Sequence, residues 1–203
     1  MFFITLLLII SSMGLDISVI TDNYETIFTE EYHNNEAEYF KMHSLSRTFC
    51  DFICRRVVVQ HIPELDQIGK IINLDIIPFY DMEAYPDEEG IDFFLETAEN
   101  DEERRQILSD AEADRQKVAN NIDLILQIVT NLIDGLSQIN NLPELLLPTD
   151  FDTLNNAVYF SDFNSDKGQG YIDNNFGQDL RNFKRFVEYA KSAGATTVWF
   201  TYN

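Results

Sequence analysis

Basic residues are scarce in this sequence. The 203-residue chain has 14 Lys and Arg against 35 Asp and Glu, which gives a formal charge of −21 and an isoelectric point near 4.2. So few cations cannot neutralise a nucleic-acid backbone, and an anionic membrane surface repels a polyanion. We therefore expect neither nucleic acid nor a membrane among the partners. Apolar residues still make up 45% and aromatic residues 13%, which excludes a disordered acidic tail and predicts one packed domain.

Long hydrophobic runs are also missing, apart from nine residues between Phe2 and Ile10. A membrane-spanning helix needs about 20 apolar residues, so this run is too short to be one. The small residues Ser12 and Gly14 follow it, in the place where a signal peptidase cuts. We therefore predict that residues 1–14 are a signal peptide and that the protein is secreted or resides in the secretory-pathway lumen. A buried N-terminal strand or helix is the alternative, because no Lys or Arg precedes the run.

Only two cysteines occur, Cys50 and Cys54. In an oxidising compartment two cysteines are expected to pair. They lie four residues apart in a helical pattern, where their Cβ atoms are about 5–6 Å apart, whereas a relaxed disulfide prefers about 3.8 Å. Three interpretations stay open: a strained or helix-terminal disulfide, two buried thiols, and cross-links to another chain.

Common enzyme motifs are absent: the sequence has no P-loop, no G-x-G-x-x-G, no G-x-S-x-G and no H-E-x-x-H. The stretch from Gly177 to Tyr202 nevertheless has the order helix, glycine, strand, and a βα-type enzyme places polar side chains at the end of such a strand. A small secreted hydrolase with a site near Trp199 and Tyr202 is therefore one alternative function. A carrier of a small apolar ligand between helices is another, because Phe and Ile are abundant.

The strongest periodic pattern predicts one long helix over residues 101–139. Asn100 can cap its start, and Pro143 follows its end. At 1.5 Å per residue this helix would be about 58 Å long, more than a compact domain of this size needs, so we expect self-association or a protein partner through the 108–139 seam. Apolar residues fill nine of ten positions spaced alternately by three and four, as in a coiled-coil seam or a long bundle helix: Leu108, Ala111, Arg115, Val118, Ile122, Ile125, Val129, Leu132, Leu136 and Ile139.

The fold class that follows is predominantly α: a helical bundle built on the long helix, with a short C-terminal strand. Residues 15–80 would form an N-terminal helical segment, and residues 101–203 would hold the long helix and a C-terminal helix–loop–helix before the strand. Three further helices are predicted to pack on the long one, at 35–61, 64–74 and 175–193.

The predicted strand is the β-branched and aromatic tail at residues 196–202. Residues 17–21 or 26–29 are its only plausible pairing partners, which makes the strand the weakest part of the predicted architecture.

A run of acidic residues precedes the long helix. Residues 81–103 contain 11 Asp and Glu and no Lys or Arg. We interpret residues 81–100 as an acidic connector, either a solvated linker or a diffuse surface for divalent cations. Some of its charge complements the dipole at the start of the following helix.

One loop has the composition of a calcium site. Asp162, Asn164 and Asp166 place oxygen atoms at alternate positions, and Asp173 follows in a Gly-Tyr-Ile-Asp stretch. Calcium prefers such hard oxygen ligands. The loop departs from an EF-hand by a three-residue insertion and by the absence of a closing Glu, and an Asx-rich turn is the simpler interpretation. Taken together, the sequence predicts a secreted, acidic, helical structural or protein-interaction protein that responds weakly to calcium and self-associates.

Overall fold

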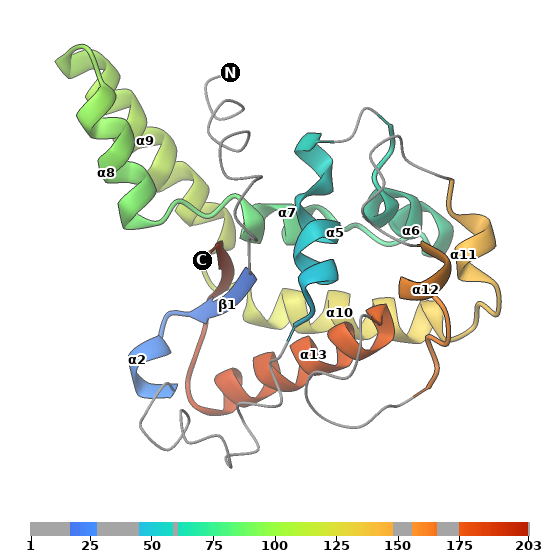
Figure 1. The fold of residues 1–203 in the computed structure, drawn as a ribbon. Coiled ribbons are helices and arrows are strands. Elements are labelled where there is room, and N and C mark those ends of the chain that lie inside the picture. The colour runs from blue at the N-terminus through green and yellow to red at the C-terminus, as the bar shows by residue number, and fades with distance from the viewer. Residues whose placement is uncertain (1–16, 28–44, 59–60, 148–155, 166–174, 203) are drawn as a thin grey trace.

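The computed structural model describes residues 17–27, 45–58, 61–147, 156–165 and 175–202, and within these ranges the chain is mostly helical with one two-stranded sheet (Figure 1). The strands are β1 (Ile17–Thr21) and β2 (Val198–Tyr202). The helices are α2 (Tyr24–Ile27), α5 (Arg47–Val58), α6 (Glu64–Ile72), α7 (Ile77–Glu83), α8 (Glu88–Thr97), α9 (Asp101–Val118), α10 (Ile122–Leu136), α11 (Leu142–Leu145), α12 (Asn156–Tyr159) and α13 (Phe176–Ser192).

The predicted C-terminal strand is confirmed, and its partner is the first of the two segments considered for it. β1 and β2 pair antiparallel, from Ile17 opposite Tyr202 to Thr21 opposite Val198. Val19 and Phe200 face each other and are fully buried, because alternate residues of a strand share one face. The sheet therefore fastens one end of the described chain to the other. The predicted signal peptide lies outside the described residues.

The hydrophobic core lies between α5, α7, α10, α13 and the inner face of β2. α10 and α13 lie side by side, and α5 runs across them (Figure 1), so the helices do not form the predicted bundle around one axis. Aromatic side chains dominate the centre of this core. Phe52 and Phe176 meet edge to face at 4.9 Å, and Phe183 lies 5.5 Å from Phe200 of β2. Such ring pairs add to the stabilisation from burial alone.

The single long helix predicted over residues 101–139 is wrong. The chain leaves the helical conformation after Val118, and Asn120 adopts a left-handed backbone with φ of 58°. Asparagine is one of the few residues that tolerate this conformation. The apolar spacing continues through the break because both halves face the same core, with Val118 and Ile122 buried on either side of it. Continuous apolar spacing is therefore compatible with two successive helices that face the same core.

Asn121 explains where the chain turns between α9 and α10. Its side-chain Nδ2 donates to the carbonyl oxygen of Val198 at 2.8 Å, and its Oδ1 accepts from the Val198 N–H at 2.9 Å. The backbone N–H of Ile122 donates to the carbonyl of Thr196. The amide of Asn121 therefore behaves like one residue of a third strand, and it fixes the start of α10 to the start of β2.

A buried carboxylate joins α13 to the start of α5. Asp179 accepts three hydrogen bonds: from the Ser46 N–H at 2.8 Å, from the Ser46 hydroxyl at 2.6 Å and from the Tyr159 hydroxyl at 2.9 Å. The Ser46 oxygen in turn accepts from the N–H of Phe49 and caps α5. All four residues are buried, so Asp179 satisfies polar groups that have no access to water.

Among the shorter predicted helices, two are confirmed. The helix predicted at 64–74 is confirmed as α6, which ends at Asn73 with φ of 52°. The helix predicted at 175–193 is confirmed as α13; Asn175 caps its start, and Gly194 follows its end with φ of 97°. Of the helix predicted at 35–61, α5 is the part that lies within the described residues.

The segment interpreted as an acidic connector is largely helical. Residues 81–100 contain the end of α7 and all of α8. Asp87 caps α8 by accepting from the Gly90 N–H at 2.7 Å, and two glutamates occupy the first turn, where negative charge is favourable. Local capping and the favourable placement of these glutamates therefore account for a helix in this acidic segment.

Candidate functional site

The acidic hairpin, which we define as Glu88–Val118, is the part of the fold that extends away from the core. α8 and α9 lie side by side and project beyond the sheet (Figure 1). α8 has no buried residue, and α9 has only Ala111 and Val118 buried. The described part of the chain therefore buries no other residue of the hairpin.

Local sequence signals build the hairpin. The Asn100 side chain accepts from the N–H groups of Glu102 and Glu103, and the Glu103 carboxylate accepts from the Glu99 N–H at 2.8 Å. These contacts resemble a capping box that satisfies the first turn of α9. The hairpin turn is thus held by its own polar groups and needs no support from the core.

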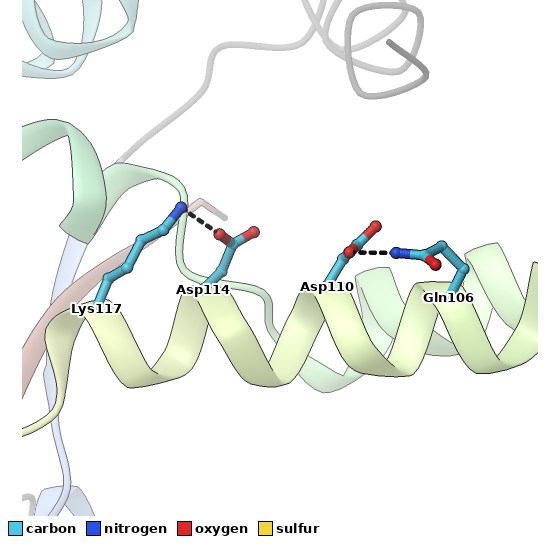
Figure 2. A network of polar contacts seen from close by, with 4 residues as sticks. All are labelled: Gln106, Asp110, Asp114 and Lys117. Atoms are coloured by element: carbon cyan, nitrogen blue, oxygen red, sulfur yellow. Dashed lines mark hydrogen bonds and ion pairs between the residues drawn. The ribbon is translucent and has the colours of Figure 1, made fainter.

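The acidic hairpin carries a large share of the net charge. It contains 11 acidic and four basic residues, and the eight carboxylates between Glu88 and Glu103 have no basic residue among them. Polar contacts between side chains lie along α9, and one of them pairs opposite charges. Figure 2 shows the Gln106 amide donating to Asp110 and the Lys117 ammonium paired with Asp114, each at 2.7 Å. The first half of the hairpin is therefore the more negative one.

Two large apolar side chains are exposed in this acidic setting. Phe93 on α8 is 46% exposed and Leu108 on α9 is 51% exposed. The ring of Phe93 meets that of Phe94 at 5.7 Å, while Phe94 and Ile107 are only half-buried. A helix pair normally buries its apolar stripe against a neighbouring element, so the hairpin presents apolar side chains that the described part of the chain leaves exposed.

Arg115 holds the base of the hairpin against the sheet. Its guanidinium donates to the carbonyl of Pro86 at 3.3 Å and lies 5.9 Å from the centre of the Tyr85 ring. Tyr85 stacks on Trp199 of β2 with ring centres 4.4 Å apart. The one polar residue of the predicted seam therefore serves as an anchor, and Trp199 is part of the same stack.

The predicted thiols and Tyr202 meet in a second cluster. The Cys54 thiol donates to the Tyr202 hydroxyl at 3.1 Å, and that hydroxyl donates to Glu83 at 2.9 Å. A hydrogen bond with Cys50 lowers the pKa of the Cys54 thiol, against the effect of burial. Burial raises the pKa of both Glu83 and Tyr202. This chain of hydrogen bonds connects α5, β2 and α7.

Cys50 and Cys54 are both thiols in this structure. Cys50 is buried and Cys54 half-buried on the same helix, α5. Positions four apart on a helix hold their Cβ atoms farther apart than a relaxed disulfide allows. The continuous helix therefore agrees with the thiol form.

Removing the Tyr202 hydroxyl is expected to destabilise the fold moderately. Tyr202→Phe leaves the half-buried Glu83 carboxylate without this donor, and a hydrogen bond to a charged group contributes about 1.5 kcal/mol or more. We expect a loss of about 1.5 kcal/mol at pH 7 in chemical denaturation, and a smaller loss at acidic pH once Glu83 is protonated. Tyr85→Phe is the matched control, because its hydroxyl lies outside this chain of hydrogen bonds. Equal losses for the two variants would contradict the assignment.

The predicted calcium loop is only partly described. Asp162 has φ of 48°, and its carbonyl accepts from the Ser165 N–H at 2.9 Å, which forms a turn. The Asn164 amide donates to the carbonyl of Ser137 at 3.0 Å. Asp166 and Asp173 lie outside the described residues. The calcium site at these four positions therefore stays a prediction.

Three observations concern the chain as a whole. The described residues contain no group of three or more His, Cys, Asp or Glu side chains placed to hold a metal ion. None of the helices in the described ranges combines the length and the apolar character needed to cross a membrane. Comparison with known protein families, with curated proteins and with solved structures found no match.

The sequence predicted the acidic charge of the hairpin but not its form as a projecting pair of helices. It placed Leu108 in a seam and the carboxylates in a connector, and it did not single out Phe93. The signal was present: Asp87 three residues before Gly90 and Asn100 three residues before Glu103 are capping patterns. These two capping patterns mark the starts of two consecutive helices, as expected for a helical hairpin.

Proposed function

We propose that this chain is a secreted protein-interaction protein that binds a protein partner through the acidic hairpin. One observation carries the proposal: α8 has no buried residue and holds Phe93, a large apolar side chain, 46% exposed among carboxylates. Secretion is supported by the apolar run at residues 1–14. Cleavage there would leave β1 intact, since this strand begins at Ile17.

The chemistry of the partner follows from the hairpin. A hairpin that carries exposed Phe93 and Leu108 and 11 acidic against four basic residues is complementary to a surface with an apolar centre and a basic rim. Burial of the exposed part of a phenylalanine contributes about 1–1.5 kcal/mol. The surrounding charges steer the encounter and select against acidic partners. We therefore expect a basic, partly apolar protein surface or helix as the partner.

The hydrolase and the apolar-ligand carrier have less support. Two hollows on the described surface lie along α6, both are open, and neither is lined by Trp199 or Tyr202. The Cys54 thiol is engaged with Tyr202, and Tyr202 with Glu83, an arrangement that links three elements. The hydrogen-bonded chain therefore accounts for these residues as part of the fold.

Peptide binding by the whole protein tests the proposal. The probe is an amphipathic helical peptide of Lys and Leu, titrated calorimetrically in 0.15 M NaCl, with a Glu and Leu peptide of the same pattern as comparison. We expect binding of the basic peptide only, and at least tenfold weaker binding by Phe93→Ser. Leu124→Ser on α10 is the matched control, because Leu124 is also 46% exposed but lies outside the hairpin.

Two results would contradict the docking role of the hairpin. One is equal binding by Phe93→Ser and the wild-type protein, which would mean that the peptide binds by charge alone. The other is equal weakening by Phe93→Ser and Leu124→Ser, which would mean that the apolar contact is not specific to the hairpin. Circular dichroism and the melting temperature of each variant check that the fold is retained.

A further inference from the structure

A groove along α6 has the properties expected of a partner for the acidic hairpin. It has a volume of about 650 Å³ and lies between the end of α5, the start of α6 and the segment after α11. The residues that line it are Arg56, His61, Ile62, Pro63, Asp66, Gln67, Lys70 and Leu147. We refer to this surface as the α6 groove.

Gln67 builds the groove by holding its two walls together. Its side-chain Nε2 donates to the carbonyls of Ile62 and Leu147 at 2.9 and 3.2 Å. Its Oε1 accepts from the Leu147 N–H at 2.7 Å. Gln67 itself is buried. A single buried amide therefore fixes the spacing of segments 80 residues apart in the sequence, and the groove is part of the folded structure.

The walls of the α6 groove are apolar and exposed. Ile62 is 46% exposed and Leu147 is 66% exposed. Lone apolar side chains are common on protein surfaces, but neighbouring ones that line a hollow mark an interaction site. The apolar part of the groove therefore offers a place for side chains such as Phe93 and Leu108.

Two cations and one carboxylate are among the described residues that line the α6 groove, although the whole chain is strongly acidic. Arg56 lies with its guanidinium 4.3 Å from the centre of the Tyr80 ring, and Lys70 is exposed on α6. Asp66, the one carboxylate among the described lining residues, accepts a hydrogen bond from the Tyr80 hydroxyl at 2.7 Å. The two permanent cations thus outnumber the carboxylate, whereas the first half of the acidic hairpin has no cation.

We propose that the α6 groove of a second copy of this chain is the docking site for the acidic hairpin. This inference rests on the proposed docking function of the hairpin and names its partner. The hairpin and α6 lie at opposite ends of the molecule (Figure 1), so one copy cannot fill its own groove. The contact is therefore head to tail, which joins copies into a chain or a ring.

Electrostatics sets the conditions for this contact. Each copy has a formal charge of −21, so two copies repel each other at low ionic strength. At 0.15 M salt the screening length is about 8 Å. The long-range repulsion is then largely screened, while Arg56 and Lys70 can still pair with hairpin carboxylates at contact distance.

Sedimentation velocity with complementary variants tests the head-to-tail contact. The hairpin variant is Phe93→Ser with Leu108→Ser, and the groove variant is Lys70→Glu with Leu147→Ser. In 0.15 M NaCl we expect the wild-type protein to associate as its concentration rises to about 1 mM, and each variant to associate at least tenfold more weakly. An equimolar mixture of the two variants should form a dimer and nothing larger, because each supplies one intact surface.

Every other outcome overturns the proposal. A wild-type protein that is monomeric over the whole range excludes this self-association, as does a mixture of variants that stays monomeric. Association lost in the hairpin variant but kept in the groove variant means that the hairpin docks elsewhere. Leu124→Ser, which alters neither surface, should associate like the wild-type protein. Ile62→Ser replaces Leu147→Ser if the latter variant fails to fold.

The outcomes also separate this inference from the function on which it rests. If the basic peptide binds in a Phe93-dependent way while the protein stays monomeric, the hairpin is a docking surface for a different protein, and only the self-association is wrong. If Phe93→Ser changes neither peptide binding nor sedimentation, both proposals fail.

Discussion

Replacing Asp179 with alanine is expected to lower the free energy of unfolding by about 3 kcal/mol at pH 5. The carboxyl group accepts hydrogen bonds from the Ser46 N–H, the Ser46 hydroxyl and the Tyr159 hydroxyl. Each buried donor left without an acceptor costs about 1 kcal/mol or more. The cap of α5 is also loosened, because Ser46 holds the N–H of Phe49. Urea denaturation followed by circular dichroism measures the loss.

The contribution of Asp179 depends on pH in a definite direction. Burial raises the pKa of Asp179 to about 6, against the hydrogen bonds that lower it. The folded state then binds a proton that the unfolded state, with a pKa near 3.8, has released. Stability from this group is therefore complete below about pH 3.8 and is lost as the pH rises through about 6. The full difference is about 3 kcal/mol, of which about half falls between pH 5 and pH 7.5.

Asp179→Asn is the control that isolates this titration. Asparagine has nearly the same shape and an oxygen for the Ser46 N–H, but it cannot ionise. We expect the stability difference between wild type and Asp179→Asn to shrink by an amount on the order of 1 kcal/mol between pH 5 and pH 7.5. Parallel stability curves for the two proteins would mean that Asp179 does not titrate with a raised pKa. For Asp179→Ala the loss at pH 7.5 should accordingly be about half that at pH 5.

Replacing Asn121 with alanine is the second change for which we expect a large effect, about 2–3 kcal/mol. The variant loses both hydrogen bonds to the Val198 backbone and leaves a donor and an acceptor unpaired at a buried position. Because Val198 also begins β2, hydrogen exchange of the β2 amides should rise more than that of α13. Denaturation measures the first effect and exchange the second.

Asn131→Ala is the matched control for Asn121→Ala. Asn131 is exposed on α10, where alanine has the higher helix propensity, so stability should change by less than about 0.5 kcal/mol, if anything upward. A loss of stability of more than 1 kcal/mol for Asn131→Ala, or of less than 1 kcal/mol for Asn121→Ala, would contradict the role given to the Asn121 side chain.

Elements with strong local signals were predicted correctly. α13 has an apolar stripe, the capping Asn175 and the terminal Gly194, and each of these acts within a few residues. The tail from Val198 is β-branched and aromatic, which favours a strand in almost any setting. Its pairing with β1 was one of two options, since sequence indicates the need for a partner but not which segment supplies it.

The long helix failed because a spacing pattern reports which side of the chain is buried, not whether the axis is straight. Asn120 and Asn121 lie between the seam residues Val118 and Ile122, and asparagine tolerates turns. Their effect depends on Val198, 77 residues away, which pairs with the Asn121 amide. Without the position of β2, the same two asparagines are compatible with an ordinary turn of helix.

The candidate site was predictable in composition and not in geometry. The carboxylates and Leu108 are visible in the sequence, but the exposure of Phe93 follows from the absence of any described element packed over α8. The α6 groove depends on Gln67 bonding to Leu147 across 80 residues. Cys54 and Tyr202 are likewise brought together only by the docking of β2 beside α5.

By itself, the sequence determined the charge of −21, the predominance of helix, the starts and ends of α6 and α13, and the strand at the C-terminal end. These properties arise from composition and from interactions over a few residues. The tertiary structure decided that the predicted long helix turns at Asn121, that the acidic segment becomes a projecting hairpin, and that an apolar and basic groove forms at the opposite end. Each of these outcomes requires a hydrogen bond or a packing contact between segments far apart in the chain, and local sequence patterns carry no information about such contacts.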